Sequence, residues 1–144
     1  MKNTILLLIA LLVFPFSLDA KRKLISMRDY GVVPHAQQLS QKLQDALIAI
    51  HAEVSPKDRV TLKFDSGEYH FHEEGSFTRE YYISNHDQDN PKHVAFALEN
   101  WSNLTLDGQG SEFLFHGQMI PVSLLNSTNV TLKNFSIDFV NPHI

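Results

Sequence analysis

The densest group of hydrogen-bonding side chains lies in the run Ser84-Asn85-His86-Asp87-Gln88. An aspartate beside a histidine can accept and donate protons in acid–base catalysis. Adjacent residues in a loop often point apart, so the spacing leaves a role in stabilising the loop equally open. We therefore take His86 and Asp87 as candidate substrate-binding residues.

Two histidines, His70 and His72, are two positions apart on a predicted strand and therefore share one face. Glu73 and Glu74 follow directly, and a metal site can begin in this way. Histidines on one exposed strand face are more often simply solvated, and sequence spacing offers no third ligand in a fixed place. We therefore predict no metal site.

Asp138 alternates with apolar neighbours, which places it on the outer surface of a predicted strand. Asp107 and Glu112 are expected on the outside as well. Glycosidases need two carboxylates across one sugar ring, but the sequence does not show which carboxylates approach one another. Asp138 and the nearby His143 complete the set of candidate substrate-binding residues.

Two further motifs have structural interpretations. The run Asp107-Gly108-Gln109-Gly110 resembles a phosphate-binding loop but lacks a third glycine and a following helix pattern, so we predict a turn. Asn-X-Ser/Thr triplets can mark N-glycosylation or asparagines stacked in ladders, and we favour ladders because several recur at a fixed spacing. The triplets begin at Asn100, Asn103, Asn126, Asn129 and Asn134.

The elements that position these residues are indicated by a repeat. Residues 93–118 align without a gap on residues 119–144, an offset of 26 residues, which sets Leu106 over Leu132 and Phe113 over Phe139. Apolar residues alternate with polar ones inside each copy, which is typical of short strands with one buried face. We predict an all-β fold, a right-handed parallel β-helix of the pectate-lyase type, truncated after its first coils. The alternative is a β-sandwich with coincidental spacing.

Four segments are expected along the chain. Residues 1–20 have the charge and apolar run of a secretory signal peptide, with an uncleaved anchor as the alternative. Residues 21–56 form a lead-in and a capping helix at Gln37–Ala52, whose apolar face carries Leu39, Leu43, Leu47 and Ile50. Residues 57–144 form the first coils, with a polar insertion at about 73–92. We expect an N-terminal piece of a longer protein, or a shortened gene.

Composition limits the possible functions. The 144 residues carry a formal net charge of −4 and the pI is about 6.0, which argues against nucleic-acid binding because that function needs a basic surface. There are no cysteines, which excludes disulfides, thiolate metal sites and a cysteine nucleophile.

Three segments of the sequence carry a resemblance to a known family. They read YYISNHDQ, LENWSNLTLDGQGSEFLFHGQMIPV and NSTNVTLKNFSIDFVNPHI. They closely resemble the first coils of secreted bacterial α-1,3-galactosidases, the β-helix enzymes of glycoside hydrolase family 110. The similarity runs from about Asp29 to Ile144 and is specific from Tyr81 onward.

The resemblance implies an enzyme that removes terminal α-1,3-linked galactose from blood-group-B and linear α-galactosyl glycans. It implies an inverting mechanism with two carboxylates and no cofactor. The catalytic acids of the family lie on later coils, so they are expected beyond Ile144 and this chain alone is expected to be inactive. The implied partner is a galactose-terminated oligosaccharide or glycoconjugate. The implied location is secreted or periplasmic, with no stable membrane insertion after signal cleavage.

Other functions remain open on the same fold. A polysaccharide lyase generally uses calcium or a basic residue beside an acidic substrate, and no coil face here carries a run of aspartates or arginines. A non-enzymatic glycan-binding β-helix is a third possibility. An incomplete product that aggregates through its open strand edge is a fourth.

Overall fold

A computed structural model describes residues 19–82 and 89–141 of the chain. The described part is rich in strands and contains one α-helix and a short 3-10 helix. The helices are α1 (Leu39–Glu53) and η1 (Met27–Tyr30). The strands are β1 (Arg22–Ser26), β2 (Arg59–Lys63), β3 (Glu68–His72), β4 (Phe77–Arg79), β5 (Lys92–Glu99), β6 (Ser102–His116), β7 (Met119–Leu125) and β8 (Thr128–Phe139).

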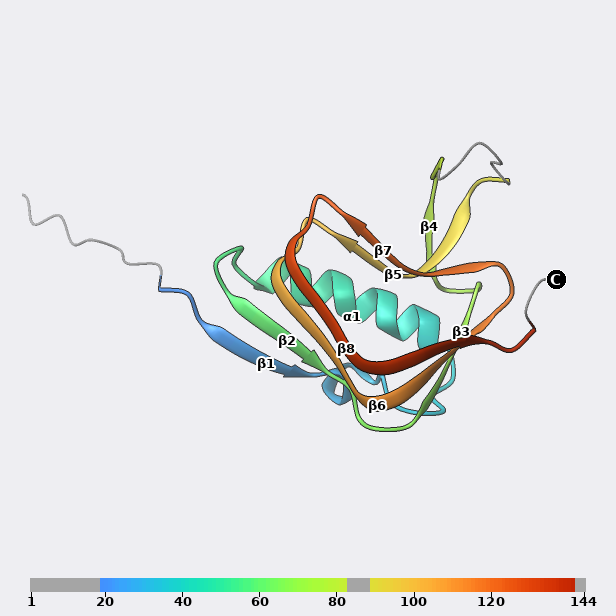
Figure 1. Cartoon of the computed structure of the whole chain (residues 1–144), viewed down its shortest axis with the longest axis horizontal. Coiled ribbons are helices and arrows are strands. Elements are labelled where there is room, and N and C mark those ends of the chain that lie inside the picture. Colours follow the sequence, from blue (N-terminus) through green and yellow to red (C-terminus); the bar gives the residue numbers. More distant parts are fainter. Residues whose placement is uncertain (1–18, 83–88, 142–144) are drawn as a thin grey trace, which may run out of the picture.

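The larger sheet is built around β6, and all its pairings are parallel (Figure 1). Along one edge of β6, β2 pairs with the first half of the strand and β3 with the second half. β8 pairs along the other edge of β6, and β1 lies outside β2. Successive passes of the chain therefore lie side by side in the same direction, as parallel sheets with buried inner faces do.

The smaller sheet contains β4, β5 and β7. β5 and β7 are parallel, and Leu98 lies beside Leu124. β4 pairs antiparallel with the other edge of β5, where Phe77 lies beside Val94. β4 thus falls within the predicted insertion and extends this sheet beyond the two parallel passes.

The predicted 26-residue register is confirmed in its first part and wrong in its second. It holds from His93 beside Met119 to Asp107 beside Lys133. Beyond Asp107 a β-bulge places three residues of β6 opposite one residue of β8, so the offset falls to 24 and Phe113 lies beside Ile137. Because the offset changes by two residues, the same side chains still face inward. The alternation of apolar and polar residues therefore does not indicate the bulge.

Aromatic side chains fill the space between the sheets. Phe113 lies at the centre of this core, with ring centroids 5.3 Å from Phe64 and 4.8 Å from Phe135. Phe115 stacks on Phe71 at 5.3 Å across the adjacent strand. The buried strand face predicted from the alternation is confirmed here, because the phenylalanines of β3 and β6 are almost fully buried. Such ring pairs stabilise a core beyond the area they bury.

The helix predicted at Gln37–Ala52 is confirmed as α1. Its predicted apolar face is buried, and α1 contacts β3 and β5. Figure 1 shows α1 lying across the space between the two sheets, behind β8. Within residues 19–82 and 89–141, no helix combines the length and apolar character needed to cross a membrane.

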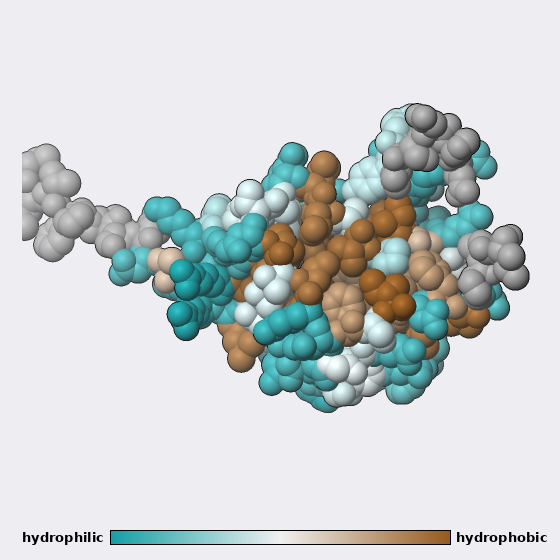
Figure 2. All heavy atoms as spheres, in the orientation of Figure 1, coloured by the Kyte–Doolittle hydropathy of each residue, from teal (hydrophilic) through white to brown (hydrophobic). Residues whose placement is uncertain are grey.

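The opposite side, formed by β7 and β8, exposes apolar side chains. Leu98 of β5 is fully buried, whereas its neighbour Leu124 on β7 is 54% exposed. Phe113 is 1% exposed and its neighbour Ile137 on β8 is 44% exposed. Figure 2 shows hydrophobic residues gathered on this face. Inward positions are therefore buried on β5 and β6, whereas the equivalent positions on β7 and β8 are partly exposed to solvent.

Asparagines occupy the bends, as the ladder interpretation predicted. The Asn129 side-chain amide donates a 2.6 Å hydrogen bond to the Asn103 side-chain oxygen, one repeat earlier. Both residues have positive φ, at 53° and 55°, a conformation that asparagine tolerates better than most residues. The local role of these side chains is to turn the backbone and tie neighbouring passes together.

We predict that Asp107 stabilises the bulge in a pH-dependent way. Its side chain accepts hydrogen bonds from the Asn134 amide at 2.9 Å and from the Gln109 backbone N–H at 3.1 Å. These bonds, Asn134 first, together with Lys133, lower the pKa of Asp107 from 3.8 to about 2. The stability that this carboxylate contributes is present above pH 3.8 and is lost as the pH falls toward 2. Asp107→Asn should lower the free energy of unfolding by about 1–2 kcal/mol at pH 7.

The measurement is thermal unfolding by circular dichroism at several pH values between 7 and 2. The difference in melting temperature between the parent and Asp107→Asn should close as the pH falls through this range. Asp45→Asn, on the exposed face of α1, removes the same charge away from the bulge and is the control. A gap that stays constant down to pH 2 would contradict the prediction.

Candidate functional site

Strands β3, β6 and β8 turn alternate side chains outward on the surface of the larger sheet. Tyr69 and Phe71 point inward, so the residues between and beside them point outward. The register sets His70 beside Leu114 of β6, and Leu114 beside Asp138 of β8. We call this outward surface the polar face; its members are Glu68, His70, His72, Glu112, His116 and Asp138.

Of the four predicted substrate-binding residues, only Asp138 lies in the described part of the chain. His86, Asp87 and His143 fall outside the described residues. Asp138 is exposed on β8 and accepts a 2.8 Å hydrogen bond from the backbone N–H of Phe139. It lies two strands from His70 in the same row, a backbone separation of roughly 10 Å at the usual strand spacing.

The carboxylates expected on the outside divide into two kinds. Glu112 is exposed on the polar face, as predicted. Asp107 was expected outside, and this prediction is wrong: only 9% of the residue is exposed, because its side chain holds the β6 bulge. The Asp107–Gly110 run is therefore part of a strand bulge, consistent with the structural interpretation and not with a phosphate loop.

The polar face contains a group of imidazoles that we call the histidine cluster: His35, His70, His72 and His116. His70 is its centre. Its Nδ1 lies 2.8 Å from His116 Nε2, and its Nε2 lies 2.5 Å from a carboxylate oxygen of Glu68. The His72 ring stacks on His116 at 4.0 Å. Burial lowers the pKa of His116, and the nearby His72 and His70 lower it further.

Backbone contacts bring the members of this cluster together. The backbone N–H of His35 donates a 3.2 Å hydrogen bond to the backbone carbonyl of Glu68, which fixes the lead-in segment against the start of β3. Gly67 permits this approach, because a Cβ there would lie 2.5 Å from the Pro34 ring. At the other end of β3, the buried Ser40 hydroxyl of α1 donates to the His72 carbonyl at 2.7 Å and accepts from its N–H at 2.8 Å.

The structure does not add a third ligand to the pair His70 and His72, because the group that it brings together contains only His70 of the two. Glu73 does not take this position, because its carboxylate accepts from the Gln118 N–H and packs against Gly117. Instead, the ligand atoms of His35, Glu68 and His70 lie within 4.8 Å of one another. Sequence reasoning missed Glu68 and His35. The alternation Glu68-X-His70 on one strand was a usable signal, whereas His35 reaches the site only through the fold.

A second polar group, the Arg79 cluster, lies on the smaller sheet and comprises Arg79, Tyr81, Glu99 and Ser123. Arg79 forms two hydrogen bonds to Glu99, from Nε at 2.6 Å and from Nη2 at 3.2 Å. The Tyr81 hydroxyl bridges Glu99 and Ser123, each at 3.2 Å. The hydrogen bond from Arg79 lowers the pKa of Glu99. A carboxylate bound in this way is held ionised, which suits hydrogen bonding better than proton donation.

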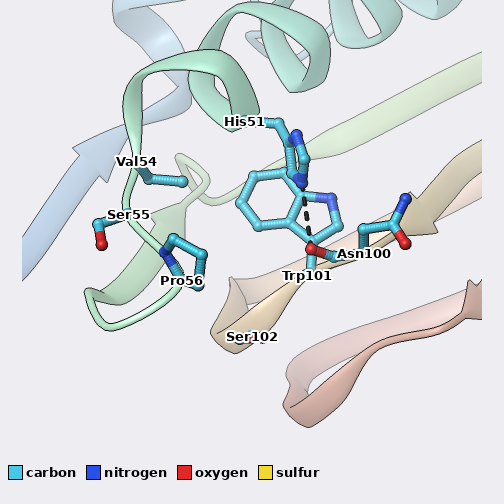
Figure 3. Close-up of a pocket in the computed structure, with 7 residues that line it drawn as sticks. All are labelled: His51, Val54, Ser55, Pro56, Asn100, Trp101 and Ser102. Carbon is cyan, nitrogen blue, oxygen red and sulfur yellow. Dashed lines mark hydrogen bonds between the residues drawn. The ribbon is translucent and has the colours of Figure 1, made fainter.

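A small hollow of about 250 Å³ lies between the end of α1 and the start of β6 (Figure 3). His51 and Trp101 meet edge to face at 4.8 Å, and a His51 ring nitrogen lies 3.2 Å from the Asn100 carbonyl. The Asn100 side chain points away from His51 in this view. Trp101 is only 3% exposed, so it closes the hollow as part of the core and offers no open ring face to a ligand.

Two arrangements are therefore available for chemistry. The polar face offers imidazoles and carboxylates that can bind hydroxyl groups or a cation. The Arg79 cluster offers an ionised carboxylate and a hydroxyl.

Comparison with known proteins identifies relatives of this chain. No family model matches it. It is 60% identical over 126 residues to a Phocaeicola vulgatus protein named alpha-1,3-galactosidase B. The aligned region covers 87% of this chain and 21% of that protein. It is 50% identical over 146 residues to an alpha-1,3-galactosidase B of Bacteroides fragilis, covering 99% of this chain and 24% of the relative. An alpha-1,3-galactosidase A of Shewanella woodyi is 41% identical over 124 residues, covering 85% of this chain and 20% of the relative.

These relatives come from different genera and match nearly all of the chain, and the chain spans about a fifth to a quarter of their length. The resemblance noted in the sequence is thereby confirmed: the chain belongs to the family of the α-1,3-galactosidases.

Proposed function

We propose that this chain forms the first coils of a glycoside hydrolase that removes terminal α-1,3-linked galactose from glycans. The observation that carries the proposal is the 60% identity to a protein named alpha-1,3-galactosidase B over 87% of the chain. The alignment covers 126 residues, so it is not limited to one motif.

The proposed architecture is a right-handed parallel β-helix whose first coil is capped by α1. Parallel passes at a 26-residue offset support it, as does the burial of one face of α1 against β3 and β5. The uncovered apolar residues of β7 and β8 support further coils on that side, because inward positions of a coil are normally covered by the next. Relatives that are four to five times longer provide sequence for such coils.

Cysteine labelling tests whether further coils cover β7 and β8. The chain has no cysteine, so Leu124→Cys and Ile137→Cys each introduce a single thiol. In the protein made from the complete reading frame, both thiols should react with a maleimide at least tenfold more slowly than in the 144-residue chain. Leu24→Cys on β1, at a position that is 70% exposed, is the control and should react quickly in both. Equal labelling of Leu124→Cys in the two proteins would contradict the added coils.

The proposed reaction is inverting, with one carboxylic acid protonating the leaving oxygen and one carboxylate activating water on the other face of galactose. Its acids are expected on later coils, as the resemblance to the family implies, and three of the described carboxylates have structural roles. Asp107 holds the bulge, Glu99 is bound by Arg79, and Glu73 holds the turn before β7. Terminal galactose of the blood-group-B type and of linear α-galactosyl glycans is the proposed substrate.

Hydrolysis by the complete reading frame is the direct test of function. The purified protein should release galactose from an α-1,3-galactosyl disaccharide, at a rate at least a hundredfold above that for the α-1,4- and α-1,6-linked isomers. Proton NMR should show the β-anomer of galactose first, as inversion requires. The 144-residue chain is the control and should release none. Binding of the α-1,3-linked glycan without any hydrolysis would instead support the glycan-binding alternative.

The proposed location is secreted or periplasmic, through a signal peptide at residues 1–20. A positively charged start followed by an apolar run supports this, and residues 1–18 lie outside the described part of the structure. N-terminal sequencing of the protein from its native host should begin at or near Lys21. A mature protein that retains Met1 would indicate the uncleaved-anchor alternative.

A further inference from the structure

We propose that His35, Glu68 and His70 bind one divalent transition-metal ion of the zinc class, and that His116 orients His70 as a ligand. This site would be separate from the glycosidase reaction, and nothing in the proposed function requires it. Two imidazoles and one carboxylate are a known zinc ligand set when a water takes the fourth position.

The positions of the ligand atoms support such a site. One ligand atom from each of the three residues lies within 4.8 Å of the other two. Tetrahedral zinc, with bonds of about 2.0–2.2 Å, needs ligand atoms about 3.3 Å apart. The Glu68 oxygen and His70 Nε2, which lie 2.5 Å apart, would separate slightly to admit the ion, and His35 would move toward them. His35 is exposed, and the Glu68 and His70 side chains are 42% and 34% exposed.

His116 supplies the support that metal-binding histidines usually have. A ligating imidazole normally donates its second ring N–H to another group, which fixes the tautomer and the ring orientation. His70 Nε2 faces Glu68, while His70 Nδ1 lies 2.8 Å from His116 Nε2. Stacking on His72 at 4.0 Å holds the His116 ring in place. Nε2 of His70 is thus presented to the ion, and Nδ1 is directed at His116.

The backbone already holds the three ligands near one another. Glu68 and His70 are alternate residues of one strand, so both project from the same face of β3. The His35 N–H is bonded to the Glu68 carbonyl, which places the third ligand beside the first. An ion here would join the lead-in segment to β3, and it should therefore stabilise the folded chain by binding to it preferentially.

The chemistry of the ligand set selects the metal. Imidazole nitrogen suits Zn²⁺, Co²⁺, Ni²⁺ and Cu²⁺, whereas Ca²⁺ and Mg²⁺ prefer sites made of oxygen atoms. We therefore expect Zn²⁺ to bind and a tenfold excess of Ca²⁺ not to displace it.

The test is metal titration of the 144-residue chain, purified without a histidine tag and treated with chelator. Calorimetry with Zn²⁺ should give one ion per chain with a micromolar or tighter Kd, and Co²⁺ should give the visible absorption bands of a tetrahedral site. Zn²⁺ should raise the melting temperature. His35→Asn, Glu68→Gln and His70→Asn should each weaken binding at least tenfold and remove the stabilisation, with the circular dichroism spectrum unchanged.

Two further variants separate the roles. His116→Gln should weaken Zn²⁺ binding by about 10–100-fold and shift the Co²⁺ bands, since it acts on His70 and is not itself a ligand. His51→Asn changes a histidine beside Trp101, away from the site, and should leave Kd and spectrum unchanged. Wild-type affinity in His35→Asn, or equal loss in His51→Asn, would overturn the proposal.

Discussion

The parallel pairing of β6 along both of its edges is the constraint on which the rest of the structure depends. One edge receives β2 and β3 from the preceding pass, and the other receives β8 from the following one. Since each pass must continue the same inward and outward alternation, β6 determines both which rings enter the core and which side chains form the polar face. Phe113, which packs in the core, and His116, which lies on the polar face, are both placed by the alternation of β6.

The order of β2 and β3 on β6 also explains how distant residues meet. Both short strands lie on one edge of one long strand, so the turn between them must stay close to β6. Ser111 bonds this turn through the Asp65 carbonyl at 3.0 Å and the Gly67 N–H at 3.2 Å. The lead-in segment then packs on Gly67, and His35 comes to rest beside Glu68. The site therefore depends on the fold of three separate segments.

Much of the fold could be predicted from this sequence, because the relevant signals are local. The alternation of Leu104 and Leu106 with polar residues predicts strands, and the spacing of Leu39, Leu43 and Leu47 predicts α1. The β-bulge could not be predicted, since skipping two residues leaves the alternation intact. The candidate site was only partly predictable. Asp138 follows from its strand, whereas the meeting of His35 with His70 depends on a tertiary contact that no periodicity records.

The bulge beside Asp107 has a consequence for how such a chain can change in evolution. Three residues of one pass are accommodated opposite a single residue of the next, and the pairing recovers immediately at Ser111 beside Phe135. Insertions or deletions of two residues at this bulge would therefore leave the inward and outward alternation of the rest of the strand unchanged. The spacing between equivalent positions of neighbouring passes can therefore change by two residues at this bulge while the packing stays the same.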